Sequence, residues 1–383
     1  MIYGQTLDHR QPKLTDKLRR VPWLFILALC ACSGVGIAML YSAAGGSMEP
    51  WAVRQLVRFA AALTILLAVA VSDIRLWLRL AYPLYGAALI LLVVVDVAGF
   101  IGMGAQRWID LGIINLQPSE VMKIALVLAL ARYFHRLGSE DLARPWRLIL
   151  PALMIIAPVA LVMKQPDLGT AMMLLAGGAA LFFAAGVRLW MFAAVGATGL
   201  AALPVAWQLL HDYQRQRVLT FLDPESDPLG SGYHILQSKI ALGSGGLFGK
   251  GYLQGTQSHL NFLPEKQTDF IFTMLAEEFG LLGSMVVLGL YAIILAYCLA
   301  IAISARSQFS RLLAFGIAVT FFLYVFINMA MVMGLIPVVG IPLPLISYGG
   351  TATVSLMLGF GLVMCVCVHR DVAIPRHSTG DEP

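Results

Sequence analysis

The strongest constraint in this sequence is a succession of apolar runs, each about as long as a lipid bilayer is thick. A helix needs about 20 apolar residues to cross the hydrocarbon core. Ten runs meet that requirement: 22–43, 52–72, 77–100, 118–137, 147–165, 168–187, 188–210, 270–304, 310–334 and 346–369. The run 270–304 is longer than one span needs, so we expect its first turns to stand outside the membrane. The pattern predicts an all-α polytopic membrane protein with ten transmembrane helices, forming a single integral membrane domain over residues 1–383.

Composition excludes the main alternatives. Charged residues make up only 12% of the 383 residues and hydrophobic residues make up 59%, whereas a soluble domain carries about 25% charged residues. A soluble globular enzyme and a disordered protein are both excluded. Because charges are so scarce, each one at membrane depth needs a physical reason.

The distribution of basic residues predicts the orientation. With the N-terminus in the cytoplasm, the inner segments hold sixteen Lys and Arg residues and the outer segments hold nine, which agrees with the positive-inside rule. An even number of spans then places both termini in the cytoplasm. The same bias explains the net charge of +5 without a nucleic-acid partner.

One long polar segment, 211–268, separates the seventh and eighth predicted spans. Loops longer than about 12–15 residues are usually functional or disordered. This loop contains aromatic residues and balanced charges, so we expect a large, ordered extracytoplasmic loop. The polar tails, 1–20 and 371–383, are expected to be disordered and cytoplasmic.

The loop contains a glycine cluster, Gly243–Gly251, which invites comparison with a phosphate-binding loop. A Walker A motif ending at Gly249-Lys250 would need Gly at position 244 and Ser or Thr at position 251, and this chain has Ser244 and Gly251. No strand is predicted before it. A flexible loop that approaches a ligand or turns sharply is the better interpretation of these glycines.

Two ionisable residues, Glu120 and Lys123, lie one helical turn apart within the fourth predicted span. Two interpretations stay open: a buried ion pair that locks two helices, or the polar wall of a cavity that holds a substrate head group. Asp167, at the outer end of another span, is either a helix N-cap or a site residue.

Arg215 and Arg217 alternate in the outer loop. Their guanidinium groups suit phosphate, although anchoring to lipid head groups is an equal alternative. Asp269 opens the long eighth run, at a position that predicts either a helix cap or a general base at the outer membrane face. No histidine spacing in the outer loop predicts a metal site made by protein ligands.

Several motifs together resemble the SEDS (shape, elongation, division and sporulation) family of bacterial membrane glycosyltransferases, over roughly residues 20 to 370. The resemblance rests on Gly104–Gly112, Gln117–Glu120, Gln165–Thr170, Tyr213–Gly251, Phe262–Glu265, Thr268–Phe272 and Gly340–Gly350. The unbroken outer loop favours the elongation branch of the family over the division branch. The family often has His where this chain has Gln267, so a base at that position is not available here.

The resemblance implies a peptidoglycan glycosyltransferase in the bacterial inner membrane that polymerises lipid II, with its active site facing the periplasm. The family's essential acidic residue maps onto Asp269, which is expected to act as the general base. The residues expected to bind substrate are Arg107, Glu120, Lys123, Asp167, Arg215, Arg217, Lys239, Glu265 and Thr268. No cofactor is expected to bind tightly, but a divalent cation, Mg or Mn, could accompany the pyrophosphate. The implied partners are a class B penicillin-binding protein and other membrane proteins of the elongation complex.

Two rival functions share these features: a lipid II flippase and a non-catalytic scaffold. A flippase should carry polar residues on both sides of the membrane midplane. Here Arg107, Glu120, Asp167, the loop and Asp269 all fall at the predicted outer side, which favours an enzyme.

Overall fold

The computed structural model describes residues 14–102, 105–110, 112, 115–209, 215, 219–221, 223, 231–260, 262, 265–372 and 374. The helices are α1 (Leu14–Arg20), α2 (Trp23–Ala43), α3 (Ala52–Val71), α4 (Ile74–Ala98), α5 (Pro118–Arg136), α6 (Ser139–Leu142), α7 (Pro145–Lys164), α8 (Leu168–Ala185), α9 (Leu189–Leu209), α11 (Ser231–Ser244), α12 (Thr256–His259), α13 (Ile271–Ser304), α14 (Gln308–Val332) and α15 (Gly350–Val368). The strands are β1 (Phe100–Gly102), β2 (Ala105–Asp110) and β3 (Asn115–Leu116).

Every predicted span corresponds to one helix. Within the described residues, eight helices are long and apolar enough to cross a membrane: α2, α3, α4, α7, α8, α13, α14 and α15. The other two predicted spans fall on α5, which carries several charged residues, and on α9, which is apolar over Leu189–Ala202. The chain is therefore a multi-pass membrane protein.

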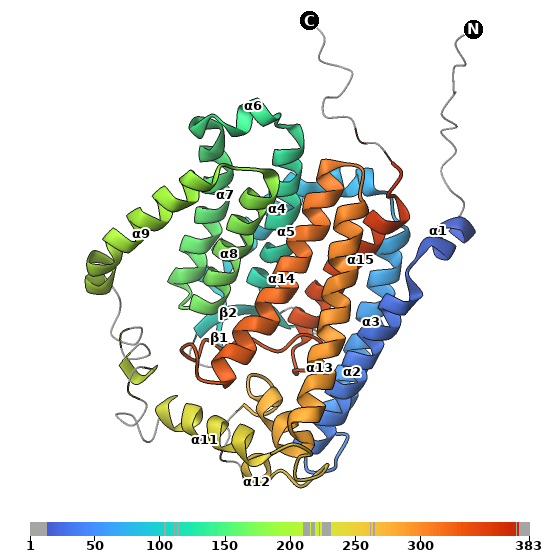
Figure 1. Ribbon diagram of the computed structural model, residues 1–383, viewed down its shortest axis with the longest axis vertical. Helices are drawn as coiled ribbons and strands as arrows, with labels where there is room; N and C mark the ends of the chain where they lie inside the picture. Colours follow the sequence, from blue (N-terminus) through green and yellow to red (C-terminus); the bar gives the residue numbers. More distant parts are fainter. Residues whose placement is uncertain are drawn as a thin grey trace, which may run out of the picture.

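The helices form one bundle in which α5, α14 and α15 lie at the centre and α9 extends to one side (Figure 1). Large apolar side chains point outward from the peripheral helices. Ile90 and Val97 on α4 and Val286 on α13 are 65%, 80% and 62% exposed. Such surfaces would promote aggregation in water, whereas against lipid tails they carry no such penalty.

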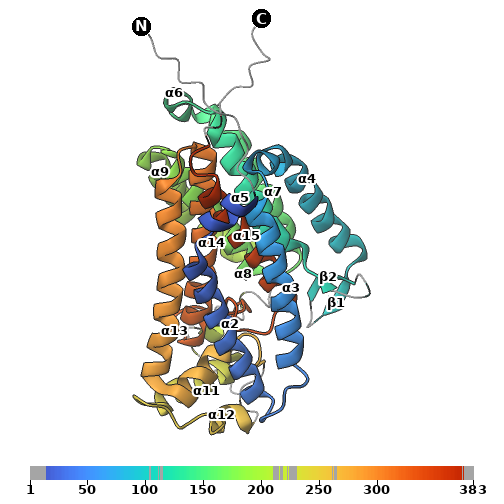
Figure 2. The same cartoon turned by 90° about the vertical axis from the view of Figure 1, so that its right-hand side faces the viewer.

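A small sheet departs from the all-α expectation. Strands β1, β2 and β3 pair antiparallel in that order, between α4 and α5. Ile109 lies opposite Leu116 and Asp110 opposite Asn115. Strands of two to six residues are too short to show a clear period, which is why the apolar pattern did not predict them. The sheet lies at the side of the bundle, below α4 and on the half away from α6 (Figure 2).

Part of the N-terminal tail that was expected to be disordered folds as helix α1. Lys17 Nζ donates to Val71 O at 2.8 Å, and Arg20 Nη1 donates to Val368 O at 3.4 Å. These carbonyls lie at the last residues of α3 and α15, where intrahelical donors are missing. These two basic residues therefore close two helix ends.

The glycine cluster packs against a break in α13. At Gly280 the backbone leaves the helical region, with φ 65° and ψ −159°. There Leu281 N donates to Gly246 O at 2.9 Å, and Gly251 N donates to Glu278 O at 3.0 Å. A Cβ on Gly249 would lie 2.1 Å from Glu278 O. The glycines therefore permit a close approach of two backbones, which the sequence pattern did not predict.

We expect Gly280→Ala to lower the free energy of unfolding by about 2 kcal/mol or more, because Ala is strained at positive φ. Its Cβ would also lie 2.4 Å from Gly249 N. The midpoint of thermal unfolding in detergent measures the effect. Gly289→Ala is the matched control, since Gly289 lies in the same helix with no atom within 4 Å of an added Cβ. Equal unfolding midpoints for the two variants would contradict the role of the break.

Candidate active-site cavity

A polar cavity of about 350 Å³ opens at the end of the bundle that carries the sheet and α11. It lies among β2, the starts of α5, α8, α13 and α15, and the end of α14. Seven of the ten predicted site residues line it: Arg107, Glu120, Lys123, Asp167, Glu265, Thr268 and Asp269. These residues come from segments as far apart in the sequence as Arg107 and Asp269, so the fold brings them together.

Asp269 lies in the turn before α13, and the structure does not support the capping interpretation. Helix α13 begins at Ile271, and no side chain caps its first turn. Among the described residues no hydrogen-bond donor reaches the Asp269 carboxylate. The carboxylate faces the cavity beside Gly340, whose added Cβ would lie 3.3 Å from Asp269 Oδ2. Asp269 is therefore available to accept a proton from a bound molecule.

The environment of Asp269 keeps its pKa near neutrality. The pKa of Asp269 is raised from 3.8 to about 6, chiefly by burial and secondly by the nearby Glu265 carboxylate, while Arg107 acts in the opposite direction. A carboxylate with this pKa is mostly ionised at pH 7 and is still basic enough to take a proton. General bases work best when their pKa lies near the operating pH.

Asn328 holds the backbone beside Asp269. Its Nδ2 donates to Asp269 O at 3.0 Å and to Ile341 O at 2.7 Å. The fully buried Asn328 amide on α14 therefore links the turn before α13 to the segment before α15. An uncharged polar residue in an apolar run is the sequence signal that could have identified it.

Glu120 and Lys123 form an ion pair at the inner wall of the cavity, with Lys123 Nζ 2.7 Å from Glu120 Oε1. Each side chain is only 4% exposed. The Tyr324 hydroxyl on α14 accepts from Lys123 and donates to Glu120. The ion-pair interpretation holds, because the pair and Tyr324 join α5 to α14. The pair also lines the cavity, and its contact with a substrate head group stays a prediction. Tyr324 itself was missed from the sequence.

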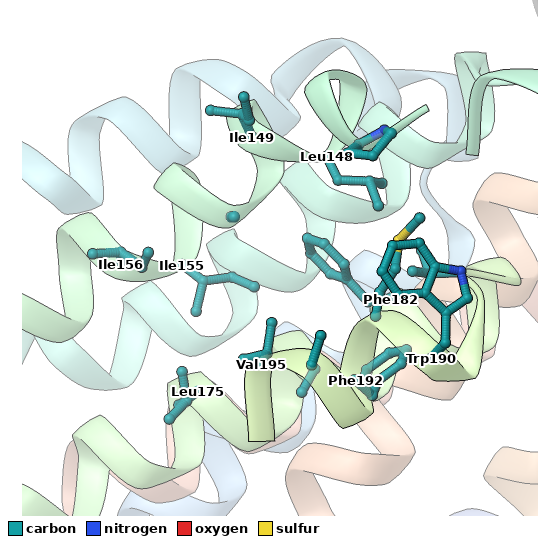
Figure 3. Close-up of a pocket in the computed structure, with 15 residues that line it drawn as sticks. Leu148, Ile149, Ile155, Ile156, Leu175, Phe182, Trp190, Phe192 and Val195 are labelled. Atoms are coloured by element: carbon teal, nitrogen blue, oxygen red, sulfur yellow. The ribbon is translucent and has the colours of Figure 1, made fainter. Parts of the chain in front are cut away.

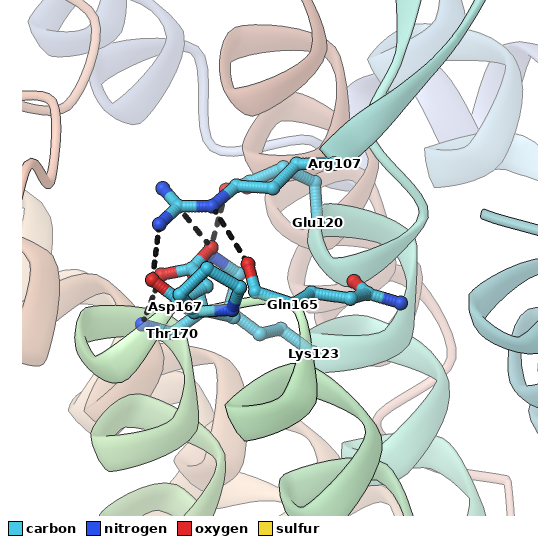
Figure 4. Close-up of polar contacts among 7 residues, drawn as sticks. Arg107, Glu120, Lys123, Gln165, Asp167 and Thr170 are labelled. Carbon is cyan, nitrogen blue, oxygen red and sulfur yellow. Dashed lines mark hydrogen bonds and ion pairs between the residues drawn. The ribbon is translucent and has the colours of Figure 1, made fainter. Parts of the chain in front are cut away.

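Arg107 and Asp167 organise the opposite wall (Figure 4). Asp167 is an N-cap of α8, since Oδ1 accepts from Thr170 N at 3.1 Å and Oδ2 accepts from Thr170 Oγ1 at 3.0 Å. Arg107 Nε donates to Gln165 O at 3.2 Å, and Arg107 Nη1 lies 3.9 Å from Asp167 Oδ2. Asp167 therefore serves as a cap and as part of the cavity.

Three predicted substrate-binding residues do not meet the cavity in the described structure. Arg215 donates to Trp207 O at 3.1 Å and to Gln208 O at 2.7 Å. Open carbonyls at the end of α9 attract its guanidinium, which the alternate spacing of two arginines could not reveal. Lys239 is exposed on α11 and lies against Gly334. Arg217 lies outside the described residues.

A non-helical segment, residues 334–349, forms the floor of the cavity, and residues 343–347 within it are buried. Ser347 Oγ donates to Thr268 O at 2.6 Å and accepts from Leu343 N at 2.7 Å. Tyr291 OH donates to Pro344 O at 2.7 Å, and Gln55 Nε2 donates to Ser347 O at 3.3 Å. Irregular backbone at membrane depth requires such partners.

A larger cavity of about 520 Å³ lies between α7, α8 and α9 (Figure 3). Its lining is almost entirely apolar and includes Leu148, Ile155, Phe182 and Trp190. Without convergent polar groups it offers nothing to orient a reacting molecule. The smaller polar cavity is therefore the candidate active site.

We expect Glu120→Ala and Lys123→Ala each to destabilise the protein by about 3–5 kcal/mol, because each leaves a buried charge without its partner. The double variant should recover part of this loss, as thermal unfolding of all three variants can measure. Lys164→Ala is the control, since it breaks an ion pair with Asp96 in which Lys164 is 68% exposed, worth about 0–1 kcal/mol. Unchanged melting in both single variants would refute the structural role of the pair.

Comparison with known proteins agrees with these motifs. Residues 22–372 match the FtsW/RodA/SpoVE family, described as cell cycle proteins. The peptidoglycan glycosyltransferase MrdB of Escherichia coli K12 is 47% identical over 352 residues, covering 91% of this chain and 92% of that protein. The probable peptidoglycan glycosyltransferase FtsW of Trichlorobacter lovleyi is 37% identical over 366 residues, covering 91% and 93%.

Solved structures give the same result. The crystal structure of the rod shape determining protein RodA of Thermus thermophilus matches with a TM-score of 0.70 and 31% identity, covering 92% of this chain and 98% of that one. A chain solved in a study of polymerization and crosslinking by a peptidoglycan synthase complex matches with a TM-score of 0.77 and 36% identity, covering 91% and 98%. The chain therefore belongs to the FtsW/RodA/SpoVE family, which is the SEDS family that its sequence motifs resemble.

Proposed function

We propose that this protein is a peptidoglycan glycosyltransferase that polymerises lipid II into glycan strands during cell elongation, with Asp269 as the general base. One observation carries the proposal: Asp269 presents a carboxylate without a hydrogen-bond donor to a polar cavity that is otherwise built from paired groups. The names of the relatives support the same activity. The other acids that line the cavity, Glu120, Asp167 and Glu265, each accept hydrogen bonds from neighbouring residues.

The reaction joins two sugars. The GlcNAc 4-hydroxyl of one glycan attacks the anomeric carbon of the lipid-linked MurNAc, and the bond from that carbon to the pyrophosphate breaks. A sugar hydroxyl is a weak nucleophile, so Asp269 takes its proton as the new bond forms. The pyrophosphate leaves with the bonding electrons, and no covalent enzyme intermediate is needed.

The leaving pyrophosphate gains negative charge, which cations nearby stabilise. Arg107 is partly exposed in the cavity and is the best-placed cation of this chain. Lys123 is held by Glu120 and Tyr324, so it contributes charge to the wall rather than a free ammonium group. Arg215, bound to the carbonyls at the end of α9, is not placed to contribute.

A divalent cation would supply further charge neutralisation when bound with the phosphates. Glu265 and Asp269 are carboxylates that could contact such a cation, since both line the cavity close to Arg107. In the described part of the chain no three metal-binding side chains come together. The cation would therefore be held mainly by oxygen atoms of the substrate.

The topology that accompanies this function has ten spans, with α5 and α9 crossing the membrane like the other eight. Both termini are then cytoplasmic, the loop 211–268 lies between the seventh and eighth spans, and the cavity faces the periplasm. Support comes from the basic residues of α1, which lie at the end of the bundle away from the cavity (Figure 2). The relative solved in a synthase complex supports a class B penicillin-binding protein as partner.

A specific observation favours an enzyme over a lipid II flippase. One turn from Tyr324 toward the start of α14, Phe321 packs against Phe360 and Tyr291, with ring centroids 5.4 Å and 5.6 Å apart. Phe321 and Phe360 are almost fully buried. This aromatic layer separates the cavity from the other end of the bundle, whereas a flippase needs a polar path between the two.

We expect Asp269→Asn to abolish polymerisation while the protein still folds and binds its partner. The assay uses purified protein with its penicillin-binding partner and labelled lipid II, and separates glycan chains on gels. Asp110→Asn is the control, because Asp110 is exposed at the same end of the bundle and does not line the cavity. Full activity of the Asp269→Asn variant would refute the assignment, and inactivity of both variants would deprive it of support.

We also expect polymerisation to fall as pH drops below about 6, because Asp269 must be ionised to act as a base and its pKa is about 6. Glu265 raises that pKa, so Glu265→Gln should lower it and move the acidic limb to lower pH. Rates measured from pH 5 to 8 at saturating lipid II test both statements. A limb that stays in place or moves to higher pH in the variant would contradict them.

A further inference from the structure

A second polar cavity, of about 370 Å³, lies at the opposite end of the bundle from Asp269. It is formed where α5 and α8 end and where α14 begins. Its lining residues are His135, Ala184, Ala185, Arg306, Ser307, Gln308, Arg311, Leu312 and Ile374. Neither the family comparison nor the proposed reaction gives this cavity a role.

The cavity carries positive charge without a balancing acid. Arg306 and Arg311 both line it, and both are exposed. Its lining contains no Asp or Glu, and within the described residues no carboxylate lies within ion-pair distance of either guanidinium. Elsewhere in the bundle, buried or partly buried cations such as Lys123 and Lys250 have carboxylate partners. Two arginines on one concave polar surface are suited to a phosphate group.

The remaining lining groups favour the same ligand. The His135 imidazole is buried beneath the cavity and packs edge-on against Phe309. Ser307 caps α14, accepting from Ser310 N at 3.1 Å, so the first turn of this 25-residue helix starts at the cavity. Its dipole adds positive potential to that of the arginines.

The position of the cavity relative to the membrane indicates that the phosphate belongs to a lipid head group. Helices α5, α8 and α14 reach this level from the membrane interior, and Ile303, three residues before Arg306, is 79% exposed, as expected beside lipid tails. The cavity therefore lies where apolar surface gives way to polar groups, which is the level of lipid head groups. Basic pockets between helix ends are typical sites for anionic head groups.

We propose that this cavity binds the phosphodiester head group of an anionic phospholipid in the leaflet on the side of α1 and α6. Arg306 and Arg311 contact the phosphate oxygens, and Ala184 and Ala185, which have small side chains, leave the room it occupies. The site is separate from the Asp269 cavity, so it does not depend on the proposed reaction. Bound lipid would join the ends of α5, α8 and α14.

Lipid binding to the purified full-length protein tests the proposal. Native mass spectrometry would titrate cardiolipin, phosphatidylglycerol and phosphatidylcholine, and thermal unfolding would be followed in parallel. For the two anionic lipids we expect Arg306→Gln/Arg311→Gln to raise Kd about tenfold or more, since each basic residue near an anionic leaflet strengthens binding severalfold. Arg75→Gln/Arg79→Gln is the control, because it removes two exposed arginines near the same end of the bundle that do not line the cavity.

A second variant distinguishes lipid binding inside the cavity from nonspecific electrostatic attraction to the two arginines. Ala184 is exposed and lines the cavity, so Ala184→Phe should fill it while leaving both arginines and the fold intact. We expect this variant to lose anionic lipid binding as well. Retained binding in either cavity variant, or an equal loss in the Arg75/Arg79 control, would overturn the proposal.

Inorganic phosphate is the competing ligand of the same chemistry. If millimolar phosphate stabilises the wild-type protein as much as anionic lipid does, and the double arginine variant loses that effect, the cavity binds phosphate from solution and the lipid assignment is overturned. We expect anionic lipid alone to raise the unfolding midpoint.

Discussion

The need to satisfy every backbone polar group away from water governs this structure. Helices satisfy their own groups, but residues 334–349 are non-helical, and residues 343–347 within this segment are buried in the bundle. Irregular backbone survives at that depth only where the protein supplies partners. Asn328, Tyr291 and Gln55 supply them from three different helices. Because Asn328 also binds the Asp269 carbonyl, the same requirement fixes the position of the proposed base.

Buried charged side chains likewise need partners. Glu120 and Lys123 neutralise each other, and Glu277, fully buried in α13, accepts from Lys250 Nζ at 2.7 Å and from Gln257 N at 3.0 Å. A buried charge without a partner is expensive, so the unmatched Asp269 carboxylate costs stability. The raised pKa of Asp269 reflects this loss of stability, and it also suits the carboxylate to proton transfer. Unsatisfied groups at such sites are commonly tolerated for function.

The local sequence pattern predicted those features of the fold that depend on residues close together in the chain. The apolar runs located the helices to within a few residues, since burial in lipid depends on the length and composition of each run. Local pattern failed where an element is too short to show a period or where its partners lie elsewhere in the fold. Strands β1 to β3 are too short for the pattern to reveal. Helix α1 forms against the ends of α3 and α15, and Arg215 turns back onto the carbonyls at the end of α9. No spacing rule encodes those partners.

The sequence by itself determined a multi-pass membrane protein, and it predicted the side on which the polar residues concentrate and Asp269 as the principal acid. These follow from hydropathy, from charge asymmetry and from motifs contiguous in the chain. Only the tertiary structure decided that Asp269 is not a cap, that Tyr324 completes the Glu120 and Lys123 pair, and that Asn328 supports the site. Hydrogen bonds depend on distances between atoms far apart in sequence, and only the packing of the bundle sets those distances.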